Sequence, residues 1–299
     1  MSYTSQAKNE ILSDRHLRSR FRNQLAFGLI CFGQRYSQEG VQLSTMESGA
    51  ARLYASMIPK LIPLEGTITT VETDNAGHIA YNVRLDQVGD RRNLLNYFAM
   101  LYPEGVTYDL LGGDEGTAAF VCGAFLACGG LSDLNRDYHL EFALPREELE
   151  PVLTGILSEV GFIPRQTKRR GLPVVYFNDS EQMEDLLTFM HCSKMSLELM
   201  GIKVLKERRN AANRAFNCDS ANIDKVVGAA SAQIADIRRL TKEQGLEALP
   251  DELRETARLR LEMPEASLRE LAEALGLSRS GVNHRLKRLS QLAGKEQNQ

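Results

Sequence analysis

Residues 267–289, SLRELAEALGLSRSGVNHRLKRL, hold the side chains best suited to chemistry, since basic and amide groups recur there with no acidic residue after Glu273. Arginine can bind guanine, and asparagine adenine, through paired hydrogen bonds. Lysine, serine and a helix N-terminus suit phosphate groups. We therefore expect contacts to a DNA duplex from the polar residues of this segment, namely Ser278, Arg279, Ser280, Asn283, His284, Arg285, Lys287 and Arg288.

Position on the predicted helix divides these residues into two groups. A recognition helix presents its N-terminal part to the base edges, which predicts that Arg279, Ser280 and Asn283 read bases. We expect phosphate contacts from Arg285, Lys287 and Arg288.

The elements that must position these side chains form a predicted helix-turn-helix. Ser267 and Glu270 make a capping box, and Gly276 permits a left-handed turn before Ser278 caps the second helix. Apolar residues at helical spacing give both helices a buried face: Leu268, Leu271, Ala272, Leu275, Val282, Leu286 and Leu289, with Leu277 at the corner. The alternative is an α-hairpin with a solvated basic face, but turn, core spacing and charge together favour DNA binding.

A second basic cluster lies in residues 203–222. Its Arg208, Arg209, Asn213 and Arg214 could make a secondary DNA contact. The alternative is a solvated helix that packs two domains together.

Length and composition set the frame. The 299 residues suffice for two domains, and 43% hydrophobic with 25% charged residues are typical of a folded soluble protein. Residues 203–299 carry 18 Lys+Arg against 14 Asp+Glu, while residues 1–202 carry 18 against 25, which places any nucleic-acid contact near the C-terminus. The charged N-terminus and the absence of a long apolar run predict no signal peptide and no membrane span. The chain has five cysteines, an odd number, and no C-x-x-C motif, which predicts a protein located in the reducing cytoplasm.

Signals of catalysis and cofactors are missing. The histidines are scattered singly, so no metal site is predicted. The chain has no Walker A sequence, no G-x-G-x-x-G and no G-x-S-x-G, and its adjacent acidic pairs do not share a helix face. We predict no catalytic residue and no cofactor.

The remainder of the chain repeats itself. LAFGLICFG (25–33) and VCGAFLACG (121–129) are each followed by a strand hairpin, an amphipathic helix, two further extended segments and a closing helix. This order predicts an α+β domain with αββαββα twice. One face of the second helix carries only small residues, namely Ala119, Gly123 and Ala127. This predicts close packing of two such helices at a seam between the copies. The alternative is one ordinary core helix.

From residue 195 onward only helices are predicted, at 195–216, 223–244, 251–262, 267–275 and 279–292. The expected domains are therefore 1–192, with repeats at about 1–105 and 114–192, then a connecting helix at 193–222 and a helical DNA-binding domain at 223–299.

The two repeats resemble degenerate copies of the LAGLIDADG motif of homing endonucleases. The whole chain resembles the WhiA family of bacterial transcription regulators, which join such a duplicated domain to a C-terminal helix-turn-helix. The residues that carry this resemblance are GAFLACGG (123–130), YHLEF (138–142), RRNAANRAFNCDSAN (208–222), GLEALPDELRETARLRL (245–261) and SRSGVNHRLKRL (278–289).

The nuclease resemblance implies an acidic metal ligand at the eighth motif position, where this chain has Phe32 and Cys128. Neither can replace a carboxylate as a ligand of Mg²⁺. The family resemblance implies a non-enzymatic, promoter-binding regulator of cell division, chromosome segregation and, where it occurs, sporulation, placed on the nucleoid in the cytoplasm.

Three alternatives stay open. An active endonuclease would need acidic residues at positions 32 and 128. A sigma-factor-like tail, suggested by residues 249–261 before the helix-turn-helix, would need a helical N-terminal domain. The nuclease-like domain could instead bind a protein partner or a small ligand.

Overall fold

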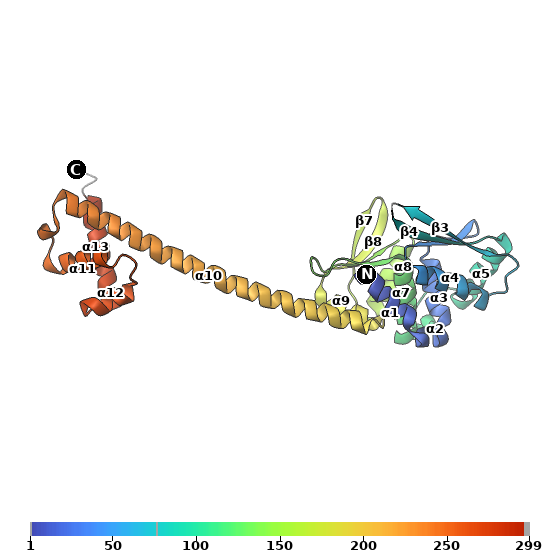
Figure 1. Cartoon of the computed structure of the whole chain (residues 1–299). Coiled ribbons are helices and arrows are strands. Elements are labelled where there is room, and N and C mark those ends of the chain that lie inside the picture. Colours follow the sequence, from blue (N-terminus) through green and yellow to red (C-terminus); the bar gives the residue numbers. More distant parts are fainter. Residues whose placement is uncertain (1, 76, 296–299) are drawn as a thin grey trace. The chain divides into compact units, whose positions relative to one another are not determined.

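The structure, a computed structural model, describes residues 2–75 and 77–295 (Figure 1). The chain divides into two compact units, the first ending at Lys206 and the second beginning at Glu207. The first is α+β and the second all α, as the sequence predicts.

Unit 1 contains the order αββαββα twice, which confirms the predicted duplication. The first copy consists of α3 (Arg22–Cys31), β1 (Arg35–Ser37), β2 (Gly40–Thr45), α4 (Ser48–Met57) with the 3-10 turn η1 (Ile58–Lys60), β3 (Ile68–Asn75), β4 (His78–Leu85) and α5 (Val88–Leu101). After α6 (Tyr108–Leu111), the second copy consists of α7 (Asp114–Cys128), β5 (Gly129–Leu131), β6 (Leu140–Ala143), α8 (Leu149–Glu159), β7 (Arg165–Arg169), β8 (Leu172–Phe177) and α9 (Ser180–Phe189).

Each copy builds one antiparallel four-stranded sheet, in the orders β1-β2-β4-β3 and β5-β6-β8-β7. Equivalent apolar pairs hold the registers, Leu43 opposite Val83 in the first sheet and Phe142 opposite Val175 in the second. All four side chains are buried. Alternate residues of a strand point to the same face, so each pair marks the buried face of its sheet. In Figure 1 the labelled strands of unit 1 lie on one side and α1–α4 on the other.

The two copies meet where α3 crosses α7, and glycine makes this contact possible. A Cβ added to Gly28 would lie 2.0 Å from the carbonyl oxygen of Phe120, and one added to Gly123 would lie 2.3 Å from that of Leu25. Both distances are too short for any side chain, so the two backbones touch directly. The predicted seam is therefore confirmed at Gly123, with Ala119 fully buried beside it and Ala127 only partly buried.

The structure differs from the expected elements at three places. Two helices precede the first repeat, α1 (Tyr3–Ser13) and α2 (Arg15–Arg20), where no element was predicted. The apolar run at 118–131, whose length and composition favour a single buried helix, instead turns into strand β5 at Gly129. The helices expected at 195–216 and 223–244 are one helix, α10 (Ser193–Glu243), because residues 217–222 include no proline or glycine that would end it.

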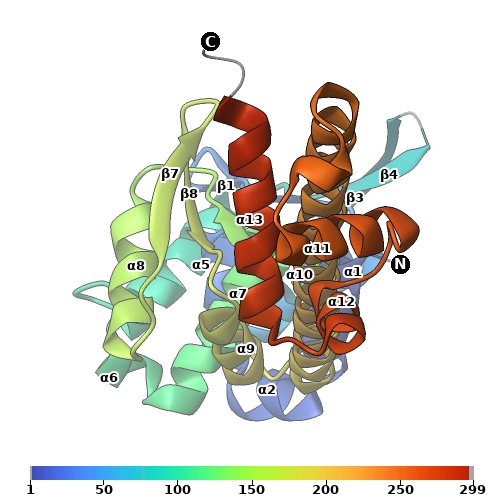
Figure 2. The same ribbon diagram turned by 90° about the vertical axis from the view of Figure 1, so that its left-hand side faces the viewer.

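Unit 2 continues from α10 through the 3-10 turn η2 (Leu246–Ala248) to α11 (Asp251–Glu262), α12 (Leu268–Leu275) and α13 (Arg279–Lys295). These helices share a small core with the C-terminal part of α10, which contributes Ile237 and Leu240. Figure 2 shows α13 with α11 and α12 beside it.

The glycine seam generates a stability prediction. Gly123→Ala should destabilise unit 1 by about 1–3 kcal/mol, because the added methyl must push α3 away from α7. The chain has nine tyrosines, all between residues 3 and 176, and no tryptophan, so urea unfolding followed by tyrosine fluorescence reports on unit 1.

The matched control is Gly155→Ala on the exposed side of α8, where a Cβ meets nothing within 4 Å. It should raise stability by roughly 0.5–1 kcal/mol, since alanine favours a helix interior. Equal urea midpoints for Gly123→Ala and the unsubstituted protein would show that the seam tolerates a side chain.

Candidate nucleic-acid interface

Local hydrogen bonds fix both ends of α12. The hydroxyl of Ser267 accepts the N–H of Glu270 at 3.3 Å, and the Glu270 carboxylate accepts the N–H of Ser267 at 2.7 Å, which confirms the capping box. The backbone N–H of Ser267, with a further contribution from its hydroxyl, holds the pKa of the Glu270 carboxyl below its ordinary value. At the other end Gly276 has φ 64°, the left-handed conformation that glycine adopts without strain. The predicted turn is therefore present.

Burial fixes how α13 sits on α12. Leu271, Val282, Leu286 and Leu289 are at most 1% exposed. Small Ala272, 5% exposed, leaves room for the second helix. The packing leaves the polar face of α13 toward solvent.

A buried arginine supports the approach to α12. Arg260 of α11 is 2% exposed and donates to the carbonyl oxygen of Ala266, directly before the capping box. Its guanidinium therefore positions the loop between α11 and α12. The sequence does not identify Arg260 as a structural residue, because its position in α11 falls on the helix face that apolar residues occupy.

Most of the predicted DNA-binding side chains are available to a ligand. Ser278, Arg279, Ser280, His284, Lys287 and Arg288 are exposed, and Asn283 is half-buried. The Ser278 hydroxyl also accepts the N–H of Gly281 at 3.1 Å, which caps α13 as predicted. Within residues 2–75 and 77–295, Arg279, Lys287 and Arg288 form no ion pair, and α13 contains no acidic residue.

Arg285 differs from its neighbours. Its side chain is 19% exposed, and its guanidinium lies 3.6 Å from the Glu252 carboxylate and 3.4 Å from the Glu252 carbonyl oxygen. It thus joins α13 to α11, a contact that helical spacing alone does not reveal.

The second basic cluster lies on α10. Arg208, Arg209, Asn213 and Arg214 are all exposed there, and the described residues offer them no acidic partner. Arg209 and Asn213 share one face of the helix, being four residues apart.

The motif positions at the ends of the seam helices hold no acidic group. Phe32, at the end of α3, is 1% exposed and packs edge-on against the ring of Phe120. Cys128, at the end of α7, donates its thiol to the carbonyl oxygen of Ala124, and burial raises its pKa to about 12. A neutral thiol and a phenyl ring do not fit a divalent metal.

Protein cations occupy the ends of both seam helices instead. Arg146 donates to the carbonyl oxygens of Cys31 and Gly33, at 2.6 and 3.0 Å. Lys8 is 6% exposed near Cys128, and burial lowers its pKa. Cations suit helix C-termini, where the unpaired carbonyls concentrate negative charge. Neither residue stands out in the sequence, because each lies far along the chain from the helix end that it approaches.

In residues 2–75 and 77–295, no group of three or more His, Cys, Asp or Glu side chains could hold a metal ion. No helix there combines the length and apolar character needed to cross a membrane.

Comparison with known proteins gives matches over both units. Residues 117–209 match the WhiA LAGLIDADG-like domain, and residues 212–293 match the WhiA C-terminal HTH domain. A relative from Clostridium tetani (strain Massachusetts / E88), named probable cell division protein WhiA, is 30% identical over 98% of this chain and 97% of its own length. A relative with the same name from Clostridium botulinum (strain Hall) is 36% identical over 70% of this chain, a stretch that spans 66% of that protein.

A solved structure shows the same fold. The crystal structure of full-length DUF199/WhiA from Thermotoga maritima matches over 99% of both chains with a TM-score of 0.57 and 20% sequence identity.

The turn geometry predicts a local stability effect. Gly276→Ala should destabilise unit 2 by about 1–2 kcal/mol, because a Cβ is strained at positive φ. In the variant, the unfolding of unit 2, measured by far-UV circular dichroism, should begin at a lower temperature than in the unsubstituted protein. The unfolding temperature of unit 1, measured by tyrosine fluorescence, should not change. Gly294→Ala, in α13 with nothing within 4 Å of the added Cβ, is the control and should not lower the transition. An unshifted Gly276→Ala transition would show that the left-handed turn is not required.

Proposed function

This chain belongs to the WhiA family, and from that premise we propose that it is a non-enzymatic, sequence-specific DNA-binding regulator of transcription that reads promoter DNA through α13. The observation that carries the proposal is the acid-free polar face of α13, which is exposed on a helix fixed by a capped turn. Such a helix can enter the major groove, where base edges present their donors and acceptors.

The residues divide by their place on α13. Arg279, Ser280 and Asn283 lie in its first two turns and read base edges in this proposal. Lys287 and Arg288 contact phosphate, with His284 between the two groups. Ser278 offers its hydroxyl at the helix N-terminus, a position that suits a phosphate.

Arg285 acts differently in this proposal. Its bonds to Glu252 hold the recognition helix against α11, so that it orients the reading residues and contributes charge only at the edge of the interface. The exposed Arg208, Arg209, Asn213 and Arg214 of α10 provide a secondary contact to the DNA backbone.

Loss of nuclease activity is part of the same proposal. Phosphodiester cleavage on this scaffold needs a divalent metal held by carboxylates. Phe32 and Cys128 supply no oxygen ligand, and the guanidinium of Arg146 already occupies the end of α3. We propose that the duplicated domain is kept for binding or assembly, including contact with a protein partner.

The relatives are named probable cell division proteins, and this name supports a proposal for the cellular role. We extend this role to the present chain as regulation of cell division, chromosome segregation and, where it occurs, sporulation. The protein would act on the nucleoid in the cytoplasm, with residues 1–192 as the nuclease-like domain, 193–222 as connector and 223–299 as the DNA-binding domain.

DNA binding by full-length protein tests the assignments on α13. Against a library of its own promoter fragments, Arg279→Ala should lose about 1–3 kcal/mol of discrimination at one base pair, because a bidentate contact disappears. Arg288→Ala should weaken all sequences alike and reduce the slope of log K against log salt by about 1. Fluorescence anisotropy at several salt concentrations measures both effects.

Arg170→Ala is the matched control for this experiment, since it removes an exposed arginine from the turn between β7 and β8. It should leave affinity and salt slope unchanged. Equal losses for Arg279→Ala on specific and random DNA would refute base reading by that residue.

Cleavage is tested separately. Promoter DNA incubated with the protein and Mg²⁺ or Mn²⁺ should stay intact on a gel, because no carboxylate stands at positions 32 and 128. Cut DNA would overturn the non-enzymatic assignment without touching the role of α13.

A further inference from the structure

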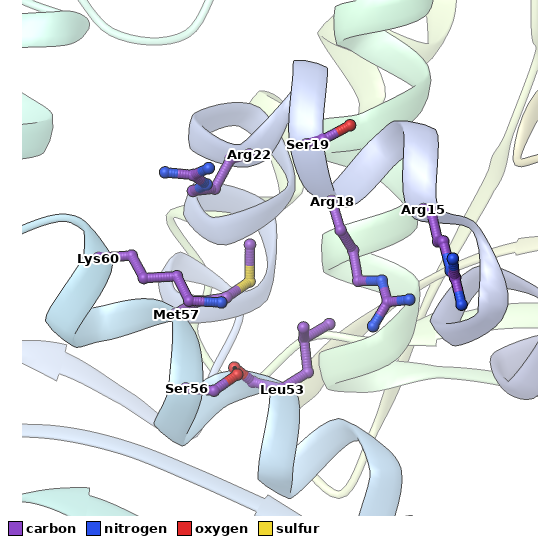
Figure 3. A pocket seen from close by; sticks show the side chains of 8 residues that line it. All are labelled: Arg15, Arg18, Ser19, Arg22, Leu53, Ser56, Met57 and Lys60. Carbon is purple, nitrogen blue, oxygen red and sulfur yellow. Dashed lines mark hydrogen bonds between the residues drawn. The ribbon is translucent and has the colours of Figure 1, made fainter.

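Four cationic side chains surround a pocket of about 360 Å³ on the helical side of unit 1 (Figure 3). They come from α2, the first residue of α3, and η1: Arg15, Arg18, Arg22 and Lys60. In Figure 3, Arg18 extends from α2 toward α4. Two apolar residues of α4, Leu53 and Met57, line the pocket and are 9% and 2% exposed.

Positive charge is concentrated around this pocket, although unit 1 as a whole has a negative net charge. Residues 1–206 carry 20 Lys+Arg against 25 Asp+Glu. Residues 15–22 and 48–64 nevertheless contain six basic residues and no acidic one: Arg15, Arg18, Arg20, Arg22, Arg52 and Lys60. Four of the six line the pocket, and no acidic residue lines it with them. Like charges repel one another, so this arrangement indicates an anionic ligand.

The cations around the pocket keep their donors available. Arg15, Arg22 and Lys60 form no ion pair with the residues that the structure describes. Arg18 donates only its Nε, to the carbonyl oxygen of Asp14 at 3.2 Å, which orients its two terminal nitrogens.

The carboxylate of Asp14, the residue directly before α2, already has its own partners. The Asp14 carboxylate accepts from the backbone N–H groups of His16 and Leu17, and lies 2.8 Å from Nδ1 of His191. These three bonds already use the carboxylate, and among the described residues it forms no bond with an arginine side chain of the pocket.

We propose that this pocket binds a small molecule of nucleotide size that carries two or more phosphate groups. Arginine forks match phosphate oxygens in pairs. A single phosphate carries about −1.5 to −2 charges, so four cations match a diphosphate or triphosphate better. The volume fits a small molecule, for which pockets of roughly 300–1,000 Å³ are usual. Leu53 and Met57 form the buried apolar floor beneath the cations.

The site is separate from the features on which the DNA-binding proposal depends. Arg22 begins α3, and Phe32 follows its other end, about 15 Å away along a helix of this length. α13 belongs to the other unit. Failure of either proposal therefore leaves the other intact.

Isothermal titration of the full-length protein with inorganic pyrophosphate and with ADP, without divalent metal, tests the site. We expect saturable one-to-one binding of both. The double variant Arg18→Gln/Arg22→Gln should bind at least about tenfold more weakly, because charge-assisted hydrogen bonds are lost. The control Arg165→Gln/Arg170→Gln removes two exposed arginines elsewhere in the unit and should bind as the unsubstituted protein does. Tyrosine-fluorescence melting verifies that each variant is folded.

Three results would overturn the proposal. One is the absence of binding at millimolar pyrophosphate and ADP. Another is an equal loss of affinity in both double variants, which would indicate unspecific attraction to positive charge. The third is a loss of duplex-DNA affinity in Arg18→Gln/Arg22→Gln without any pyrophosphate binding, which would make the pocket a DNA-backbone contact.

Discussion

The direct contact between the backbones of α3 and α7 is the constraint on which unit 1 depends. Gly28 lies against the carbonyl of Phe120, and Gly123 against that of Leu25, so the helices approach more closely than any side chain would allow. This approach joins two sheets from separate copies into one core. It also brings Arg146 of the second copy to the end of α3 in the first, where its guanidinium binds two main-chain carbonyls.

Unit 2 is organised by local rules instead. The capping box at Ser267, the left-handed Gly276 and the cap at Ser278 each act within a few residues, and they set the start of α13. A small core then suffices to hold the helices. Local hydrogen bonds and a few leucines thus fix α13, and of its polar residues Arg285 adds a contact to α11 through Glu252.

The difference between local and distant causes explains what the sequence could predict. The repeat order, the helix-turn-helix and the seam at Gly123 were predictable, because each leaves a pattern within one segment. The continuity of α10 was not, since residues 217–222 resemble a helix start but lack a residue that would end the helix before it. Lys8, Arg146 and the pocket of Arg15 and Lys60 were also missed, because residues from separate elements meet there only after folding.

The seam also sets an order of events during synthesis. In α3 every residue from Leu25 to Cys31 is buried, yet much of what covers it, α7, lies about 95 residues later along the chain, counted from Gly28 to Gly123. At translation rates of roughly 5–20 residues per second, this apolar helix waits on the order of 5–20 seconds for its partner. A nascent chain of this protein therefore carries an apolar helix without its partner for that interval.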